Sequence, residues 1–229
     1  MPDERSPATA APDSGRVCRR LVIDCLRGTR APADPCMGII TGRASTVSPA
    51  LAARLTAPAI PAAVLLPVVE RRCGRLDLVF TRRAEQLRQH AGQISFPGGR
   101  IDPDDGGPLA AALREAHEEI GLNPADVGIA GYLDTQYTIT GFAVTPVVGL
   151  VVESVFQPIP APDEVDEIFH VPLAFFLDRR HWVSRTLDVH GTQVEMTEYH
   201  WCEHRIWGAT GAIVERFALR LLARLAAGK

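Results

Sequence analysis

The segment from Arg114 to Leu122 carries three carboxylates at helical spacing, and this pattern constrains the chain more than any other. Residues i, i+3 and i+4 lie side by side on a helix, so Glu115, Glu118 and Glu119 are expected on one face. The opposite, buried face is expected to consist of Leu109, Ala112, Leu113, Ala116 and Ile120. One helix is therefore predicted to serve both the core and a polar site.

Clustered carboxylates of this kind favour a hard metal ion. Like charges four residues apart destabilise an isolated helix by roughly 0.2 to 0.5 kcal/mol per pair, and crowded carboxylates raise one another's pKa. A bound cation removes both penalties, and oxygen ligands with water in the remaining positions suit Mg²⁺ or Mn²⁺ rather than Zn²⁺. An ordinary solvated acidic face is the alternative interpretation.

The loop before this helix favours the metal-site interpretation. Phe96-Pro97-Gly98-Gly99 contains two glycines, which allow backbone to approach a ligand closely. Asp102 and Asp105 lie in the same loop. Pro108 is expected to open the helix, and Asp104 or Asp105 could instead act as its N-terminal cap.

These residues carry a family resemblance. Gly99 to Leu122 resembles the signature of the Nudix hydrolases, a glycine followed by Arg-Glu-x-x-Glu-Glu-x-Gly. The segment from Thr81 to Gly99 resembles the one that marks the coenzyme A pyrophosphatase branch. The similarity covers roughly residues 60 to 225 and does not include the first fifty or so.

The loop departs from the common signature at one place. Gly106 lies in the region where the signature has a Glu, and the spacing from Gly99 to Arg114 is one residue longer than usual. The pair Asp102 and Asp105 is itself similar to the coenzyme A branch, so the departure supports the narrower resemblance.

The resemblance implies an α/β Nudix fold in which a mixed β-sheet is sandwiched between α-helices. It implies metal-dependent hydrolysis of the diphosphate bond of coenzyme A and its derivatives, giving 3′,5′-ADP and 4′-phosphopantetheine, with Mg²⁺ or Mn²⁺ as cofactor. The metal ligands would be Glu115, Glu119, Glu118 and the carbonyl of Gly99. Arg114 would hold the helix register through bidentate contact with a carboxylate.

Further site residues are expected outside the helix. Glu164 stands where the coenzyme A branch has an additional acid, and we expect a second metal ligand or the base that activates water; capping or solvation is the alternative. The candidates for binding the 3′-phosphate or the diphosphate are Arg82, Arg88 and His90, and Gln93 is also expected to bind substrate. A solvated basic loop is the alternative for the three basic residues.

Strand patterns and composition complete the expected organisation. Residues 1–50 are predicted to form an N-terminal extension, partly disordered with a short helix, and 51–229 the Nudix domain. Strands are predicted at Ala62–Val69, Leu76–Thr81, Val127–Asp134 and Phe142–Val152, the first two forming a hairpin that delivers Arg82 toward the site.

Charge and cysteine content limit the partners and the location. A net charge of −3 provides no general attraction to nucleic acid or membranes, and neither is expected as a partner. Five cysteines without a Cys-x-x-Cys pair argue against a disulfide scaffold and fit a reducing cytoplasm. His200 and His204 have a spacing that can hold zinc, but their aromatic neighbours favour an aromatic wall. A homodimer is left open.

Two other functions fit the same residues. The nearer one is the same chemistry on another nucleoside diphosphate derivative, such as a reduced dinucleotide, ADP-ribose or an oxidised nucleotide. The more distant one is a non-catalytic nucleotide-binding regulatory module, which has no need of the complete set of glutamates.

Overall fold

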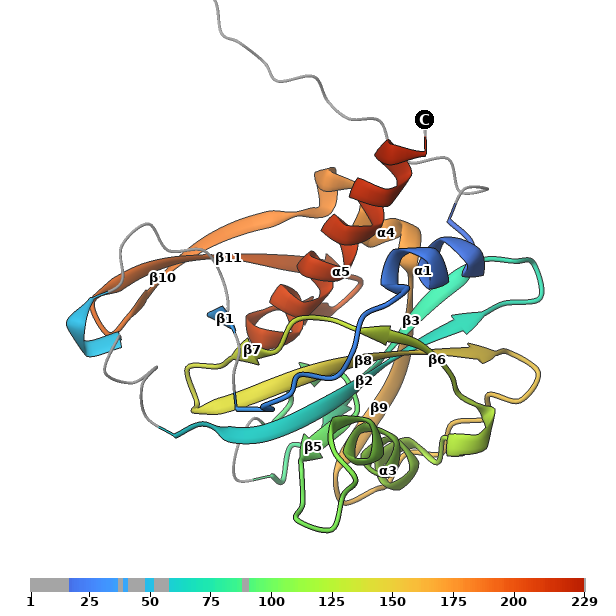
Figure 1. Cartoon of the computed structure of the whole chain (residues 1–229), viewed down its shortest axis with the longest axis horizontal. Helices are drawn as coiled ribbons and strands as arrows, with labels where there is room; N and C mark the ends of the chain where they lie inside the picture. The colour runs from blue at the N-terminus through green and yellow to red at the C-terminus, as the bar shows by residue number, and fades with distance from the viewer. Residues whose placement is uncertain (1–16, 37–38, 41–47, 52–57, 88–90, 229) are drawn as a thin grey trace, which may run out of the picture.

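In a computed structural model of the chain, the residues described are 17–36, 39–40, 48–51, 58–87 and 91–228. They form a large mixed β-sheet, a small antiparallel sheet and the helices around them (Figure 1). The helices are α1 Arg19–Leu26, α3 Pro108–Ile120, α4 Leu173–Leu177 and α5 Gly208–Ala227, with the 3₁₀ turns η2 Pro124–Asp126 and η3 Arg179–His181. The large sheet contains β1 Ile39–Ile40, β2 Ile60–Glu70, β3 Leu76–Arg83, β4 Ile94–Ser95, β5 Gly98–Arg100, β6 Gly128–Tyr132, β7 Gln136–Tyr137, β8 Phe142–Val152 and β9 Val165–Pro172. The small sheet contains β10 Val183–Val189, β11 Thr192–Trp201 and β12 His204–Ile206.

β2 organises the large sheet. Along one edge it pairs in parallel with β8 over the whole length of both strands. Its other edge is divided, because its first half pairs antiparallel with β5 and its last residues pair antiparallel with β3. β3 in turn pairs with β4 and β9. The sheet therefore forks between β5 and β3, and the glycine pair of β5 lies at this fork.

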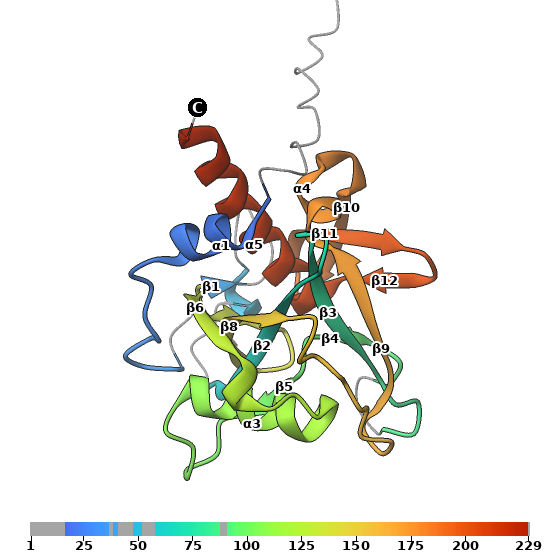
Figure 2. The same ribbon diagram turned by 90° about the vertical axis from the view of Figure 1, so that its right-hand side faces the viewer.

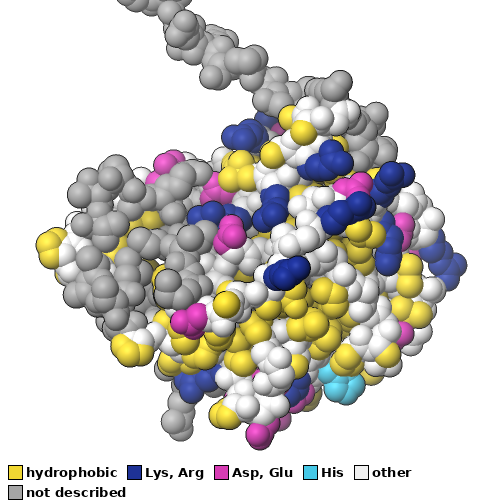
Figure 3. Space-filling model, viewed as in Figure 1, with side chains coloured by type: hydrophobic (Ala, Val, Ile, Leu, Met, Phe, Trp, Pro, Cys, Tyr) yellow, Lys and Arg dark blue, Asp and Glu magenta, His cyan; other side chains and the backbone are white. Residues whose placement is uncertain are grey.

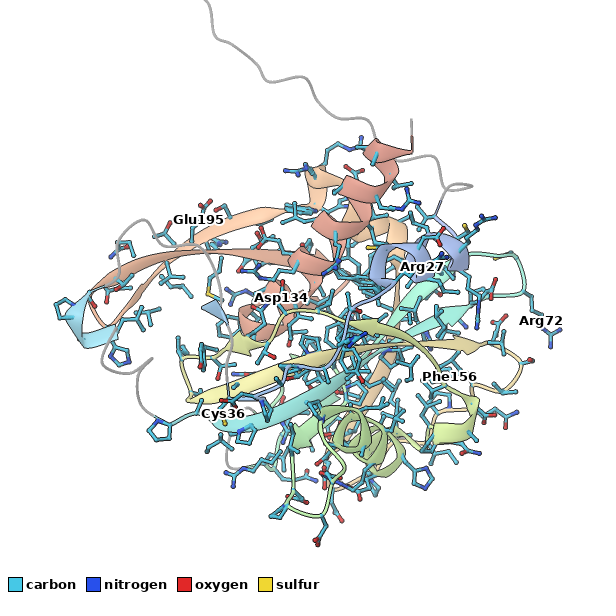
Figure 4. The ribbon with its side chains drawn as sticks, in the orientation of Figure 1. Arg27, Cys36, Arg72, Asp134, Phe156 and Glu195 are labelled. Atoms are coloured by element: carbon cyan, nitrogen blue, oxygen red, sulfur yellow. The ribbon has the colours of Figure 1, made fainter. Side chains whose placement is uncertain are left out.

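Helices cover both faces of the sheet, as Figures 1 and 2 show. α3 packs on one face over a core that includes Leu65, Val79 and Val147, and this core also contains Phe156, labelled in Figure 4. α1, α4 and α5 pack on the other face over a larger core that includes Phe80. β2 and β8 are almost continuously apolar because both of their faces are buried. The predicted α/β fold with a mixed sheet between helices is confirmed.

The predicted elements agree closely with the observed ones. The strand Phe142–Val152 has the predicted bounds, and the hairpin strands extend slightly beyond theirs. The short helix expected near the N-terminus is α1, whose Val22 and Leu26 are buried in the larger core. Residues before position 51 thus contribute to the packed structure, while the division of the chain at residue 50 stays a prediction.

The surface over α1 and α5 is rich in Arg side chains, as the upper part of Figure 3 shows. Part of this charge is structural, because Nε of Arg220 on α5 donates a hydrogen bond to the Cys25 carbonyl of α1, at 3.2 Å. None of the described helices has the length and apolar character needed to cross a lipid bilayer.

The small sheet is the main element that the sequence did not reveal. Its centre holds the buried carboxylate of Glu198, which accepts hydrogen bonds from Arg185, His200 and Arg205. Burial opposes ionisation of Glu198, but these donors outweigh it and lower its pKa to about 2. A buried carboxylate on a strand interrupts the alternation by which half-buried strands are recognised in a sequence.

Gly98 provides a test of the fork. A Cβ atom at Gly98 would lie 2.4 Å from the carbonyl oxygen of Ala63 and 2.6 Å from Cα of Val64, and both are backbone atoms of β2. We expect Gly98→Ala to lower the free energy of unfolding by about 1–3 kcal/mol, as overpacking does, because β2 cannot move aside. Chemical denaturation would measure this change.

The matched control is Gly106→Ala, since a Cβ atom at Gly106 would meet no atom within 4 Å. The control is expected to unfold like the wild-type protein. Equal stability of Gly98→Ala and the control would contradict the close approach of β5 and β2.

Candidate active site

α3 begins and ends through backbone geometry. Its N-cap is Gly107, no side chain caps the first turn, and Pro108 occupies the first helical position. The alternative in which Asp104 or Asp105 caps the helix is therefore wrong. At the other end Gly121 adopts a left-handed conformation with φ 67°, and its N–H donates to the His117 carbonyl at 3.0 Å.

The three glutamates of α3 differ sharply in burial. The side chain of Glu118 is 55% exposed and that of Glu115 is 16% exposed, while Glu119 is only 3% exposed. The expectation that all three glutamates lie on the face opposite the buried one is thus corrected, because Glu119 turns toward the sheet and belongs to the buried face. The buried face also contains Ala111, whereas Leu109 and Leu113 are only partly buried.

Glu119 lies against the backbone of β5. Its Oε2 accepts a hydrogen bond from the N–H of Gly98 at 3.2 Å, and its Oε1 lies 3.7 Å from Nη1 of Arg83. Burial raises the pKa of Glu119 to about 8, although Arg83 and the Gly98 N–H act in the opposite direction. A cation next to Glu119 would offset the cost of charging this buried carboxyl group.

Glu115 occupies the space next to Gly99. A Cβ atom on Gly99 would lie 2.3 Å from Oε1 of Glu115, so this position has room for the carboxylate only because the residue is a glycine. Burial raises the pKa of Glu115, the hydrogen bond from Arg114 lowers it, and the charges of Glu118 and Glu164 raise it further. The charge of Glu115 in turn raises the pKa of Glu119, as crowded carboxylates do.

Arg114 links two glutamates of α3, Glu115 and Glu118, to Asp105 of the preceding loop. Its Nε and Nη2 donate to the two carboxylate oxygens of Asp105 at 3.1 and 3.0 Å, which is the bidentate contact expected of its planar fork. Its Nη1 donates to Glu115 at 2.9 Å and to Glu118 at 3.1 Å. The hydrogen bonds from Arg114 lower the pKa of Asp105. The loop acid therefore anchors Arg114, which in turn orients Glu115.

The loop that carries Glu164 is joined to the end of α3. The N–H groups of Ile159 and Ala161 donate to the carbonyls of Ile120 and Glu119 at 3.0 and 2.9 Å. These carbonyls lie in the last turn of the helix and have no partner within it. Glu164 is exposed and close enough for its charge to raise the pKa of both Glu115 and Glu119.

The donor set fits a divalent cation centred on the inner carboxylates. Glu115 and Glu119 are drawn toward the glycine backbone, and a cation between them would relieve the penalty that raises their pKa values. Glu118 instead points to Arg114. The glutamates of α3 do not form a preassembled cluster of metal ligands. Among the described residues, such a cluster is formed by Glu167, Glu203 and His204, whose ligand atoms all lie within 4.8 Å of one another.

Within that second group, Glu167 is already paired through both of its carboxylate oxygens. Oε1 of Glu167 lies 3.2 Å from Nε2 of His204, and its Oε2 lies 3.3 Å from Nε of Arg82. His204 also stacks on Phe169 at 3.8 Å between ring centroids. His200 bonds to Glu198 on β11 instead, so the two histidines do not share a ligand and the aromatic interpretation is the better one.

The predicted substrate-binding residues do not all lie at the glutamates. Arg82 is paired with Glu167 and is not delivered to the glutamates, whereas the next residue, Arg83, reaches Glu119. The carbonyl of Gln93 accepts the N–H of Arg83 at 3.0 Å, which places Gln93 beside the site. Arg88 and His90 lie outside the described residues.

Arg83 is the candidate that sequence reasoning missed. Two consecutive arginines on a strand point to opposite faces, and the sequence does not say which one meets α3. A register shift between Arg82 and Arg83 in the pairing of β3 with β9 makes the assignment harder still.

The pKa of Glu119 predicts how stability depends on pH. Because the folded-state pKa of about 8 lies above the ordinary value of 4.5 for a glutamate, the native state holds a proton that the unfolded state releases between these values. The stability contributed by neutral Glu119 is fully present below about pH 4.5 and is lost as pH rises through about 8. In the presence of a chelator, Glu119→Gln should therefore be more stable than the wild-type protein at pH 8.5.

Thermal unfolding from pH 5.5 to 8.5 measures this difference. Glu118→Gln serves as the control, because it removes one negative charge from the exposed side of the same helix. Parallel pH profiles for wild type and Glu119→Gln would show that Glu119 is not a buried titrating group.

Comparisons with known proteins identify the family of the chain. A family model of the NUDIX domain matches residues 59–188. The chain is 40% identical over 164 residues to a protein of Citrobacter koseri named uncharacterized Nudix hydrolase NudL, a match that covers 70% of this chain and 82% of that protein. The NudL protein of Yersinia enterocolitica is 42% identical over 162 residues, covering 69% and 79% of the two chains.

Among solved structures, a Nudix hydrolase from M. smegmatis, RenU, matches with a TM-score of 0.42 and 24% identity, covering 50% of this chain and 71% of that one. The NUDIX model spans more than half of the chain, and the NudL match extends over most of each relative. The chain belongs to the Nudix hydrolase family.

Proposed function

We propose that this protein hydrolyses the diphosphate bond of coenzyme A and its derivatives, giving 3′,5′-ADP and 4′-phosphopantetheine, with Mg²⁺ or Mn²⁺ as cofactor. Nudix hydrolases generally use divalent metals and bind nucleoside diphosphate substrates. The observation that carries the proposal is the pair of inward-facing carboxylates, Glu115 and Glu119, against the glycine backbone of β5. The choice of coenzyme A rests on the resemblance of residues 81–99 to the coenzyme A branch.

Residues of α3 and β5 would hold the cation. We assign Glu115 and Glu119 as the principal ligands, with Glu118 and the carbonyl of Gly99 completing the set. A bound divalent ion supplies charge neutralisation for the diphosphate and makes nearby water more acidic. The raised pKa values of Glu115 and Glu119 support this assignment, because they report negative charge that the protein itself leaves poorly compensated.

The other residues bind the substrate, orient Glu115 or transfer a proton. Arg83 binds a diphosphate oxygen, since its guanidinium already faces the glutamates. Arg114 keeps Glu115 in place through its own contacts with Asp105. Glu164 takes the proton of the attacking water while the oxygen of that water bonds to phosphorus and the bond to the leaving phosphate breaks. Arg82, Arg88, His90 and Gln93 are assigned to the nucleotide end of the substrate.

The cellular setting of this activity is part of the same proposal. All five cysteines are free, which supports a reducing cytoplasm. A homodimer stays a prediction.

Incubation with coenzyme A in ¹⁸O-labelled water tests the reaction. With Mg²⁺ or Mn²⁺ present, we expect 3′,5′-ADP and 4′-phosphopantetheine, with ¹⁸O in the phosphate of one of the two products. Efficiencies on reduced dinucleotides, ADP-ribose and oxidised nucleotides are expected to be lower. A higher efficiency on one of these would assign the enzyme to that substrate, and nucleotide binding without turnover on any of them would favour the regulatory module.

Glu119→Gln is expected to lose at least about 100-fold in turnover, the scale on which a positioned electrostatic group acts. Glu195→Gln is the matched control, because Glu195 lies on β11, well away from α3 in Figure 4. Near-normal turnover in Glu119→Gln would remove Glu119 from the mechanism.

Gly99→Ala is expected to affect the activity of the protein without affecting its stability. The added Cβ atom would lie 2.3 Å from Oε1 of Glu115, the far end of a flexible side chain, so the carboxylate moves and the backbone does not. We expect a thermal midpoint close to that of the wild-type protein but about 10- to 100-fold lower turnover, since misplacement by about 1 Å has effects of this size. Full activity in Gly99→Ala would show that the position of Glu115 is unimportant.

A further inference from the structure

Arg100 is a cation next to the candidate site without an acidic partner among the described residues. It is exposed and ends β5, one residue after Gly99. Its backbone is well held, because the strand pairs with β2 at Ala62 and its carbonyl accepts a hydrogen bond from Nη2 of Arg114 at 3.2 Å. Its guanidinium carbon lies 5.8 Å from the centroid of the Phe142 ring.

Arg100 and the glutamates lie on opposite faces of the sheet. Successive residues of a strand point to opposite faces, and a side chain on Gly99 would point at Glu115 on the α3 face. Arg100 therefore points to the other face, toward Phe142, which packs against the larger core. In the described sheet β5 pairs with β2 along one edge and with no strand along the other. A substrate that passes this open edge can reach both faces.

The chemistry of this arrangement suits a phosphate. A guanidinium stacked on an aromatic ring keeps its N–H edge free for bidentate contact with an anion. The ring attracts the cation and helps to hold it in place. Arg82, one of the two arginines that were expected from the sequence to bind phosphate, is already paired with Glu167 at 3.3 Å. Arg100 is thus the better placed anion-binding side chain on this face.

We infer that Arg100, held over Phe142, binds the ribose 3′-phosphate of the substrate. The inference rests on the proposed function, because coenzyme A has a phosphate at this position whereas ADP-ribose and NADH do not. The diphosphate must reach the glutamates and Arg83 on the α3 face, so an anion held by Arg100 is a second one. Arg100 would then be the residue by which the enzyme distinguishes coenzyme A from other nucleoside diphosphate derivatives.

Equilibrium binding tests this without turnover. Calorimetry with 3′,5′-ADP and 5′-AMP is expected to show tighter binding of 3′,5′-ADP to the wild-type protein by about 10- to 100-fold, the usual scale for hydrogen bonds to a charged group. Arg100→Ala should reduce this ratio to near 1 and leave 5′-AMP binding unchanged. Arg100→Lys should restore part of it, because the charge returns without the planar fork.

The matched control is Arg179→Ala. Arg179 is also exposed and also lies over an aromatic ring, that of Trp182 at 5.0 Å. It belongs to η3, which follows α4 near the start of β3, whereas Arg83 and the glutamates lie at the end of that strand. Arg179→Ala should retain the wild-type preference for 3′,5′-ADP.

Kinetics on coenzyme A and dephospho-coenzyme A provide the second readout. Arg100→Ala should raise KM for coenzyme A with little change in kcat, and neither constant should change for dephospho-coenzyme A. Equal losses on both substrates would place Arg100 on the diphosphate and overturn the inference. Equal binding of 3′,5′-ADP and 5′-AMP by the wild-type protein would overturn it as well.

The two proposals fail in different ways. A wild-type protein that prefers 3′,5′-ADP through Arg100 but does not cleave coenzyme A would contradict the proposed function and retain the binding site. A protein that cleaves coenzyme A with an unchanged 3′-phosphate preference in Arg100→Ala would retain the function and reject the site.

Discussion

The close contact of α3 with the glycine backbone of β5 is the interaction on which the rest of this structure depends. Gly98 donates its N–H to Glu119, and Gly99 leaves space for the carboxylate of Glu115. A side chain at either position would meet the backbone of β2 or the glutamate itself. Burying a carboxylate costs several kcal/mol unless it is compensated, and here the compensation is one N–H and an arginine 3.7 Å away. The fold thereby holds carboxyl groups where a bound cation can favour their charged form.

Two arginines near the glutamates have different roles: Arg114 is structural, and Arg83 is available to a substrate. Arg114 takes Asp105 and Glu118, and so holds the outer acids in a fixed arrangement around the loop and helix. Arg83 lies on the inner side, near Glu119 but beyond the usual length of a hydrogen bond. The inner carboxylates consequently have raised pKa values, whereas that of Asp105 is lowered. On the exposed side of α3, the charge of Glu118 is thus balanced by Arg114. On the side that faces the sheet, the charged forms of Glu115 and Glu119 are disfavoured.

The forked sheet explains how residues distant in the sequence reach this place. β2 shares one edge between β5 and β3, so the glycine pair and Arg83 approach α3 from two different strands. The loop with Glu164 is held by hydrogen bonds to the last carbonyls of α3 and by the N–H of Ala84, which donates to the Glu164 carbonyl at 2.9 Å. Several elements therefore converge on one end of the helix, and α3 alone would not form the site.

Local patterns in the sequence were sufficient to predict the helix of Glu115 and Glu119 and the apolar strands β2 and β8. The helix follows from its spacing of 3.6 residues, and the two strands follow from their continuous apolar runs. The bidentate contact of Arg114 was implied by the family resemblance. Only the tertiary structure decided that Glu119 is buried, that Arg83 and not Arg82 meets it, and that Arg100 faces Phe142. Those outcomes depend on strand pairing, on the register shift in β3 and on the space left by two glycines, which are contacts between elements far apart in the chain.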